Sequence, residues 1–113
     1  MENINQIIIS TLKSVGLPTY FINKPEHIKI DDYITFNYIE NEDWFSNDTS
    51  ELSEFSVTLN YISTDLENIV DNNKVIKNAL RSNERVMSVK QFQTVYDNSK
   101  RCYLTVFTLK IYK

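Results

Sequence analysis

Hydrophobic residues near the start of the chain recur with the period of an α-helix. The residues at this spacing are Ile4, Ile7, Ile8, Leu12 and Val15. Gly16 follows where a helix commonly ends in a left-handed residue, and Pro18 cannot continue the helix because it lacks an N–H donor. We therefore predict a short helix over residues 4–15, which needs a sheet against which to bury its one apolar face.

Three segments follow with the composition and pattern of β-strands. Residues 19–22 and 33–39 are rich in β-branched and aromatic residues, which favour a pleated, half-buried strand. Residues 54–63 give the clearest pattern, because apolar and polar side chains alternate along the segment. In the middle strand we expect the more apolar face to point to the core, and this face consists of Ile34, Phe36 and Tyr38.

A second amphipathic helix is predicted after residue 63. Thr64 and Glu67 have the spacing of a capping box, a hydroxyl followed three residues later by a glutamate. Asn72 and Asn73 are poor helix formers, so we expect the helix to be irregular there and to end near residues 82–83. The predicted apolar stripe consists of Leu66, Ile69, Val70, Ile76, Ala79 and Leu80.

Two strands over residues 86–96 and 101–112 complete the pattern, joined by the turn-forming residues 97–100. The order helix, strands, helix, strands, with neighbouring strands joined by loops and hairpins, predicts an α+β fold. We expect one domain over residues 1–113. It would be a two-layer sandwich with a mixed or antiparallel sheet of four to five strands and both helices on one face.

Residues 41–53 interrupt this pattern with an aperiodic, acidic stretch, which we interpret as a long surface loop. A calcium loop would need a glycine at its sharp turn, and the stretch has none, so a solvated face is the ordinary interpretation. Trp44 and Phe45 inside it either pack back onto the domain or wait for a partner surface. The carboxylates in and beside the loop are Glu40, Glu42, Asp43, Asp48, Glu51 and Glu54.

Charge is distributed unevenly along the chain. The whole sequence has 12 basic and 15 acidic side chains, a net charge of -3. Residues 1–65 hold 3 basic and 11 acidic side chains, a net charge of -8, whereas residues 66–113 hold 9 basic and 4 acidic, a net charge of +5. Two interpretations stay open. Either the acids simply gather in one loop, or the folded protein has oppositely charged flanks that could meet head to tail in a ring.

The second helix and its end carry a basic stripe. Because the chain is acidic overall, its acidic loop would repel phosphate, and nucleic-acid binding has a weak case. We expect a solvated helix face or a contact with the acids of a neighbouring subunit. The residues of the stripe are Lys74, Lys77, Arg81 and Arg85.

Composition excludes several classes of functional site. One Cys leaves no intrachain disulfide framework, one His leaves too few ligands for structural zinc, and one Gly excludes Gly-rich phosphate loops. His27 lies in a polar connection with no nucleophile around it, and Cys102 is expected to be a small strand residue beside Arg101. Asp31 and Asp32 would point to opposite faces of a strand. We therefore expect no catalytic residue, no metal and no cofactor.

The chain also lacks the signals of a membrane or secreted protein. Its longest unbroken apolar run, residues 7–9, is far shorter than the roughly 20 residues that span a bilayer. The amino terminus has neither a basic leader nor a small-residue cleavage site. We expect no membrane partner and a reducing, cytosol-like compartment.

Most of the chain takes part in one further pattern, which combines strands, a helix and a loop. Its segments are Tyr33–Tyr38, Trp44–Asp48, Phe55–Ser63, Ile76–Leu80, and Tyr96–Asp97 with the strand from Tyr103 to Ile111. In these segments the chain resembles the small tail-terminator proteins of long-tailed bacteriophages and prophages, also called tail-completion or head–tail joining proteins. It departs from them in the last hairpin turn, residues 98–100, where members often have a glycine.

This resemblance implies a structural virion protein without enzymatic activity or cofactor. The subunits would be in the host cytoplasm before assembly and in the tail or neck of the virion afterwards. There they would form a ring, commonly a hexamer, on a completed tail tube. The ring would stop tube growth, dock to the head–tail connector and let DNA pass only through its lumen. On this hypothesis Trp44 and Phe45 are assembly anchors. The carboxylates of the same loop, Asp43, Asp48 and Glu51 among them, would contact Lys74, Lys77, Arg81 and Arg85 of a neighbour.

Two alternatives remain. The first is a neck or head-completion protein that docks to the portal rather than to the tube. The second is a non-viral module that binds a protein or a small ligand, using an aromatic-lined sheet face as a pocket.

Overall fold

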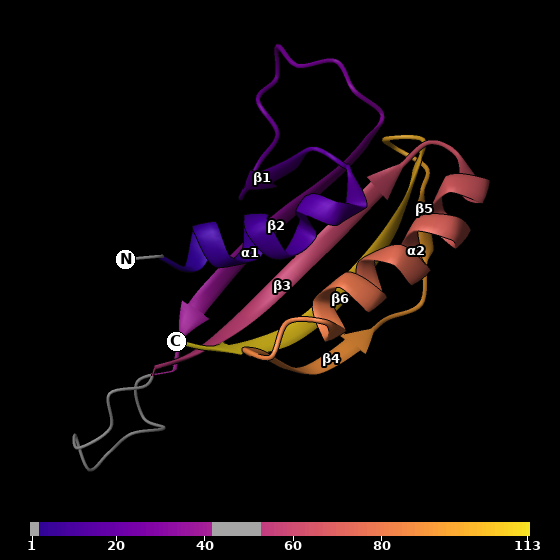
Figure 1. Ribbon diagram of the computed structural model, residues 1–113. Helices are drawn as coiled ribbons and strands as arrows, with labels where there is room; N and C mark the ends of the chain where they lie inside the picture. Colours follow the sequence, from indigo (N-terminus) through magenta and orange to yellow (C-terminus); the bar gives the residue numbers. More distant parts are fainter. Residues whose placement is uncertain (1–2, 42–52) are drawn as a thin grey trace.

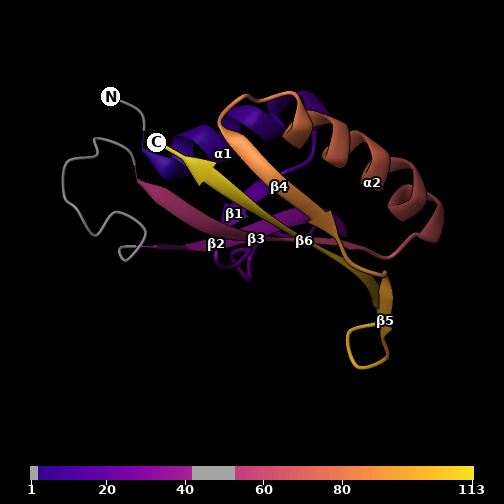
Figure 2. The ribbon, with the colours of Figure 1, turned by 90° about the horizontal axis from the view of Figure 1, so that it is seen from below.

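Two helices pack against one face of a β-sheet and form two layers with it (Figures 1 and 2). The computed structural model describes residues 3–41 and 53–113. Neither helix in these ranges has the length and apolar character needed to cross a membrane. In chain order the elements are α1 (Ile4–Leu12), the 3-10 turn η1 (Lys13–Val15), β1 (Thr19–Phe21), β2 (Asp32–Glu40), β3 (Glu54–Ser63), α2 (Leu66–Arg81), β4 (Val86–Gln91), β5 (Val95–Asp97) and β6 (Cys102–Tyr112).

The strands of the described residues form one sheet in the order β1-β2-β3-β6-β4, and β5 also pairs with β6. β1 runs parallel to β2, and every other pair is antiparallel. The predicted α+β class with both helices on one face is confirmed. The sheet has six strands rather than four to five. The predicted strand over residues 86–96 is divided at residues 92–94 into β4 and β5, and β4 itself has a register shift between Met87 and Lys90.

The core lies between the sheet and the helices. The side chains of β2 that were expected to face it do so, because Ile34 and Phe36 are fully buried and Tyr38 packs against the same cluster. The alternation of β3 and β6 places their apolar residues on this face as well. The largest buried side chains are Tyr61, Phe36, Phe107, Ile7, Ile8, Leu12, Ile34, Leu59, Ile69, Ile76, Leu80 and Ile111.

Helix α1 begins and ends where its sequence provides caps. The Asn3 side chain accepts from the backbone N–H of Gln6, and the Gln6 side chain accepts from the backbone N–H of Asn3, so the two form a capping box. After α1 the chain continues into η1, which ends at Gly16 with φ 82°, the left-handed conformation expected from the sequence. Tyr38 on β2 donates to Asn5 at 2.5 Å and fixes the helix to the sheet.

Helix α2 corrects three expectations. Its N-cap is Asp65 rather than Thr64, because the Asp65 carboxylate accepts from the backbone N–H of Glu67 at 2.8 Å. Leu66 and Val70, expected in the apolar stripe, are 49% and 53% exposed. The helix also continues without interruption through Asn72 and Asn73, where we expected irregularity.

The asparagines of α2 are tolerated because their amides bind the sheet. Asn73 is buried and donates to Thr105 on β6 at 3.1 Å. Asn72 donates to the Tyr61 hydroxyl at 2.8 Å. Each of these hydrogen bonds replaces one that the amide N–H made with water in the unfolded chain. The two asparagines, although poor helix formers, therefore link the helix layer to the sheet.

Asp32 joins the amino-terminal turn of α2 to the sheet. One of its carboxylate oxygens accepts from the Tyr61 hydroxyl at 2.6 Å, and the other accepts from the Asn68 amide at 2.8 Å. Burial and this hydrogen bond raise the pKa of Tyr61, so the phenol stays protonated and remains a donor. Asp31, its neighbour in sequence, is exposed.

Ile22 occupies a backbone conformation that β-branched residues rarely adopt. Its φ is 70°, in the left-handed region, while its N–H donates to the Phe36 carbonyl at 2.8 Å. The side chain is 55% exposed, so burial offsets little of the backbone strain.

Replacing Asp32 by alanine is predicted to destabilise the fold. The change leaves the Asn68 amide and one bond of the Tyr61 hydroxyl unmade, at a cost of about 1–3 kcal/mol in the free energy of unfolding. The matched control, Asp31→Ala, is expected to change that free energy by less than about 0.5 kcal/mol. Urea denaturation followed by circular dichroism measures both. Equal effects of the two substitutions would contradict the role given to Asp32.

Two substitutions at Ile22 separate strain from loss of side-chain contact. Ile22→Asn relieves the strain because asparagine accepts the left-handed region, whereas Ile22→Thr keeps a β-branched side chain there. We expect the asparagine variant to be more stable than the threonine variant by about 1 kcal/mol. Thermal unfolding monitored by circular dichroism compares them, and a threonine variant of equal or greater stability would refute the strain at this position.

Candidate functional site

The predicted assembly loop is only partly within the described residues. Asn41 and Ser53, at its two ends, are described, whereas residues 42–52 lie outside the described ranges. The assignment of assembly roles to this stretch therefore stays a prediction. The candidate residues that fall outside are Asp43, Trp44, Phe45, Asp48 and Glu51.

Glu54 forms a polar clamp at the root of this loop. It is only 4% exposed, although the sequence placed it with the solvated acids of the loop. Its carboxylate accepts from Asn41 at 2.6 Å and from the Tyr112 hydroxyl at 3.0 Å, and it lies 3.8 Å from the Lys110 ammonium. The bond to Glu54 and partial desolvation raise the pKa of Tyr112. The partners compensate the cost of burying a carboxylate.

The clamp fixes where the loop leaves the sheet. Asn41 also donates to Ser56 on β3, at 2.8 Å. Ser53 and Lys113 exchange two backbone hydrogen bonds, of 2.7 and 2.9 Å, so the pairing of β3 with β6 extends past the last strand residue. One end of the loop, Ser53, is thus held by Lys113, and the other end, Asn41, is held by Glu54 and Ser56. Sequence reasoning missed this role. Glu54 is in phase with the polar face of the alternating segment, and a side chain on that face is expected to be solvated rather than buried.

The predicted basic stripe is divided between two places. Lys74, Lys77 and Arg81 lie on α2, of which Lys77 is half-buried and the other two are exposed. Arg85 lies past the helix, where its carbonyl accepts from the Tyr112 N–H at 3.0 Å. Arg85 is therefore next to the root of the loop, and the structure does not bring it into one row with the helical residues.

Two exposed apolar residues of α2, Leu66 and Val70, share a side with its bases Lys77 and Arg81. Leu66, Val70, Lys77 and Arg81 follow one another at intervals of four, seven and four residues, which places them on one row of the helix. Asn73, on the neighbouring row, donates toward Thr94 in the β4–β5 connection at 3.4 Å. This side of α2 therefore faces the outer edge of the sheet. The position of Leu66 and Val70 beside the buried row is visible in a helical projection, and it is the signal that could have predicted their exposure.

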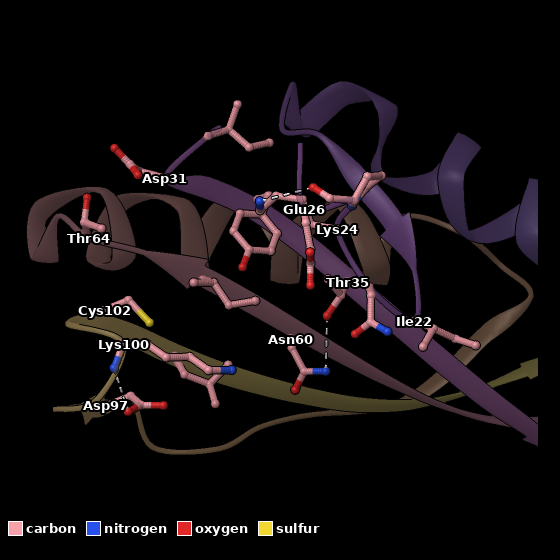
Figure 3. A pocket seen from close by; sticks show the side chains of 16 residues that line it. Ile22, Lys24, Glu26, Asp31, Thr35, Asn60, Thr64, Asp97, Lys100 and Cys102 are labelled. Atoms are coloured by element: carbon pink, nitrogen blue, oxygen red, sulfur yellow. Dashed lines mark hydrogen bonds between the residues drawn. The ribbon is translucent and has the colours of Figure 1, made fainter. Parts of the chain in front are cut away.

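The opposite face of the sheet forms an open groove of about 920 Å³ (Figure 3). Thr35 on β2 and Asn60 on β3 lie at its floor, 3.5 Å apart. Lys24 contributes from the connection before β2, and Lys100 from the last hairpin. Tyr33 is the one aromatic residue among the described residues that line the groove, so the surface differs from the aromatic-lined pocket considered for a ligand carrier.

Cys102 also lines this groove but has the properties of a structural thiol. It is buried at the start of β6. Burial and the nearby Asp97 carboxylate raise the pKa of the thiol, whereas a nucleophilic cysteine needs a lowered one. His27 is exposed in the connection before β2. Across residues 3–41 and 53–113, no three His, Cys, Asp or Glu side chains gather to hold a metal ion.

The strand order keeps the two halves of the sequence on separate flanks. Residues 1–65, with a net charge of -8, supply α1, β1, β2 and β3, whereas residues 66–113, with +5, supply α2 and the strands from β4 to β6. Within the sheet of the described residues the two sets meet where β3 pairs with β6 (Figure 1), and outside the sheet α2 also packs against α1, η1 and β3. The strands of the two halves are therefore not interleaved, although five of the eleven carboxylates of residues 1–65 lie outside the described residues.

Comparison with known proteins finds a likeness of fold. No protein-family model matches the chain, and no curated protein sequence matches it. Among solved structures, it is similar to a chain in the virion of a native gene transfer agent (GTA) particle, with a TM-score of 0.58. The likeness covers 94% of this chain and 83% of that chain, at 9% sequence identity. At this identity the likeness shows a shared fold.

Proposed function

We propose that this protein is a structural virion protein, a tail terminator that forms a ring on the tail tube of a long-tailed phage or prophage. The observation that carries the proposal is the likeness of fold to a chain of a virion particle, which extends over nearly the whole of this chain. The sequence resemblance to tail terminators, noted in the strands and the loop between β2 and β3, supports the same function.

The arrangement of charge supports assembly into a ring. A ring of identical subunits uses two different surfaces of each subunit, one for the preceding and one for the following neighbour. The strand order puts residues 1–65 and 66–113 toward opposite ends of the sheet, and unlike charge on two such flanks would provide this pair. The acidic flank depends mainly on five carboxylates outside the described residues, Glu2, Glu42, Asp43, Asp48 and Glu51. A chain with mixed charges on both flanks would have no such preference.

Capping follows from the shape of such a ring. One face of the ring would match the last ring of the tube and bind it, whereas the other face would not repeat the surface of the tube. Growth of the tube would stop, and the new surface would receive the head–tail connector. The loop over residues 41–53 is the candidate contact element, because the Glu54 clamp holds both of its ends at one end of the sheet.

The loop aromatics give the first test. Replacing both Trp44 and Phe45 by alanine is predicted to weaken ring or tail binding at least tenfold while leaving the melting temperature of the purified chain unchanged. The assay deletes the gene from its phage or prophage, complements it with either form, and measures tail lengths and infectious particles by electron microscopy and plating. The matched control replaces two polar residues of the same stretch, Ser46→Ala and Asn47→Ala, and should complement fully.

Other outcomes of this assay point elsewhere. Normal tail lengths with heads left unjoined after deletion would favour the neck protein that docks to the portal. Normal tails together with full infectivity would contradict a virion role altogether.

We also propose that the chain is not an enzyme, and the Cys102 thiol tests this. Because its pKa is raised, the reactive thiolate is scarce until the pH exceeds the ordinary range for cysteine. Alkylation by iodoacetamide at pH 8 is expected to be at least tenfold slower in the native chain than in urea, with its pH midpoint shifted upward. Rapid alkylation of the native chain near pH 6–7 would indicate an activated nucleophile instead.

A further inference from the structure

The groove on the open face of the sheet is built from segments that lie far apart in the sequence (Figure 3). One wall comes from the connection between β1 and β2, and the other comes from the hairpin between β5 and β6. The floor consists of side chains of β2 and β3 that point away from the core. Its volume of about 920 Å³ lies in the range of sites that hold ligands. The groups that line it decide which ligand fits.

Two polar side chains on the floor use little of their capacity for hydrogen bonds. Thr35 is only 8% exposed, and within the described ranges its hydroxyl makes one bond, the 3.5 Å contact with the Asn60 amide. This distance exceeds the roughly 2.7–3.2 Å of an ordinary N–H···O bond. A threonine hydroxyl can donate once and accept twice, and an asparagine amide can donate twice and accept twice. Because buried polar groups normally have partners, a polar ligand in the groove would supply the missing bonds.

Charges of both signs line the groove and nearly cancel. Three carboxylates and two ammonium groups belong to the lining, namely those of Glu26, Asp31, Asp97, Lys24 and Lys100. The Lys24 ammonium already donates to the carbonyls of Pro25 and Ile28, at 3.4 and 2.5 Å, so its own connection satisfies it. A phosphate group would meet more carboxylates than ammonium groups here, and it would be repelled. The groove therefore favours a ligand without net negative charge.

The apolar part of the lining is aliphatic. Its members are Ile22, Pro25, Ile30, Ile62 and Leu104. Tyr33 is the one aromatic side chain among the described residues of the lining, and the Lys24 ammonium lies over its ring, 5.5 Å from the centroid. A nucleobase or a sugar binds best on an open aromatic ring, which this lining does not offer. Aliphatic side chains instead pack well against the side chains of a polypeptide.

We propose that this groove binds an extended peptide segment of a partner protein, one without net negative charge. A peptide backbone offers a donor and an acceptor at each residue, which are the groups that Thr35 and Asn60 can still bind. Its aliphatic side chains would contact Ile62 and Leu104 on the floor and on the adjoining strand. Binding here leaves the core and both helices undisturbed, because the groove lies on the opposite face of the sheet. The inference goes beyond the tail-terminator function and does not depend on it.

The test uses one pair of asparagines on the open face of neighbouring strands. Asn60→Ala removes the amide on the floor of the groove. The matched control is Asn37→Ala, since Asn37 lies two residues after Thr35 on the same face of β2 but does not line the groove. A second variant, Thr35→Val, removes the buried hydroxyl and keeps a β-branched side chain. Circular dichroism confirms that each variant is folded, and Thr35→Val provides the test if Asn60→Ala is not.

A displayed library of random heptapeptides, selected on the purified full-length chain, supplies the probes. Enriched peptides are synthesised with a fluorescent label, and fluorescence polarisation measures their dissociation constants. We expect values of about 100 μM or tighter for the unmodified chain and for Asn37→Ala. Binding to Asn60→Ala and to Thr35→Val should be at least tenfold weaker. A glycan array and sedimentation of the chain alone test a sugar and a second copy of the chain as other occupants.

Three results would overturn the inference. The first is a selection that enriches no binding peptide, and the second is a set of peptides that bind Asn60→Ala as tightly as Asn37→Ala. The third is a glycan, or a dimer of the chain, whose binding Asn60→Ala abolishes while no peptide depends on this residue. The tail-length assay is independent of this test. Peptide binding in the groove together with normal tails after gene deletion would keep the groove and reject the terminator function.

Discussion

The pairing of β3 with β6 is the interaction on which the rest of the structure depends. Ten residues of β3 are in antiparallel register with β6, from Glu54 opposite Tyr112 to Ser63 opposite Tyr103. This ladder is the one place where the acidic and the basic halves of the chain join within the sheet. At one end of this ladder the Glu54 carboxylate accepts a hydrogen bond from the Tyr112 hydroxyl, at the root of the loop. The outer strands β1 and β4 lie on opposite sides of this central pair, so the separation of the two sheet edges follows from it.

The sequence predicted what depends on local periodicity. Alternation in residues 54–63 identified a strand and its buried face, and the spacing of isoleucines in the first helix identified its contact with the sheet. It failed where a polar side chain has a distant partner. Asn72 and Asn73 were expected to disturb α2, yet their amides bind Tyr61 and Thr105, and Asn73 is 32 residues from Thr105 in the sequence. Helix propensity describes a residue whose side chain is surrounded by water. A hydrogen bond to a residue far away in the sequence forms only in the tertiary fold, so helix propensity does not include it.

The candidate site was predictable in chemistry but not in position. Charge counting identified an acidic and a basic half, because it needs no fold. Whether those halves stay apart depends on strand order, and a sequence in which β1 paired beside β4 would have mixed them. The stripe from Lys74 to Arg85 shows the limit clearly. Lys74, Lys77 and Arg81 all lie on α2, as their helical spacing predicts. Arg85 comes after the end of α2, and its carbonyl bonds the N–H of Tyr112 on β6.

An isolated sheet with two apolar, unpaired edges is a liability for a free monomer, because each edge can template further pairing. Natural proteins commonly protect such edges with charge, bulges or covering elements. Here β4 has an irregularity between Met87 and Lys90, and basic residues border its edge, yet large apolar side chains remain exposed there. Pairing of unlike edges in a closed ring leaves no edge free, whereas an open chain always leaves two. In the proposed ring, closure would remove both exposed edges of the monomer.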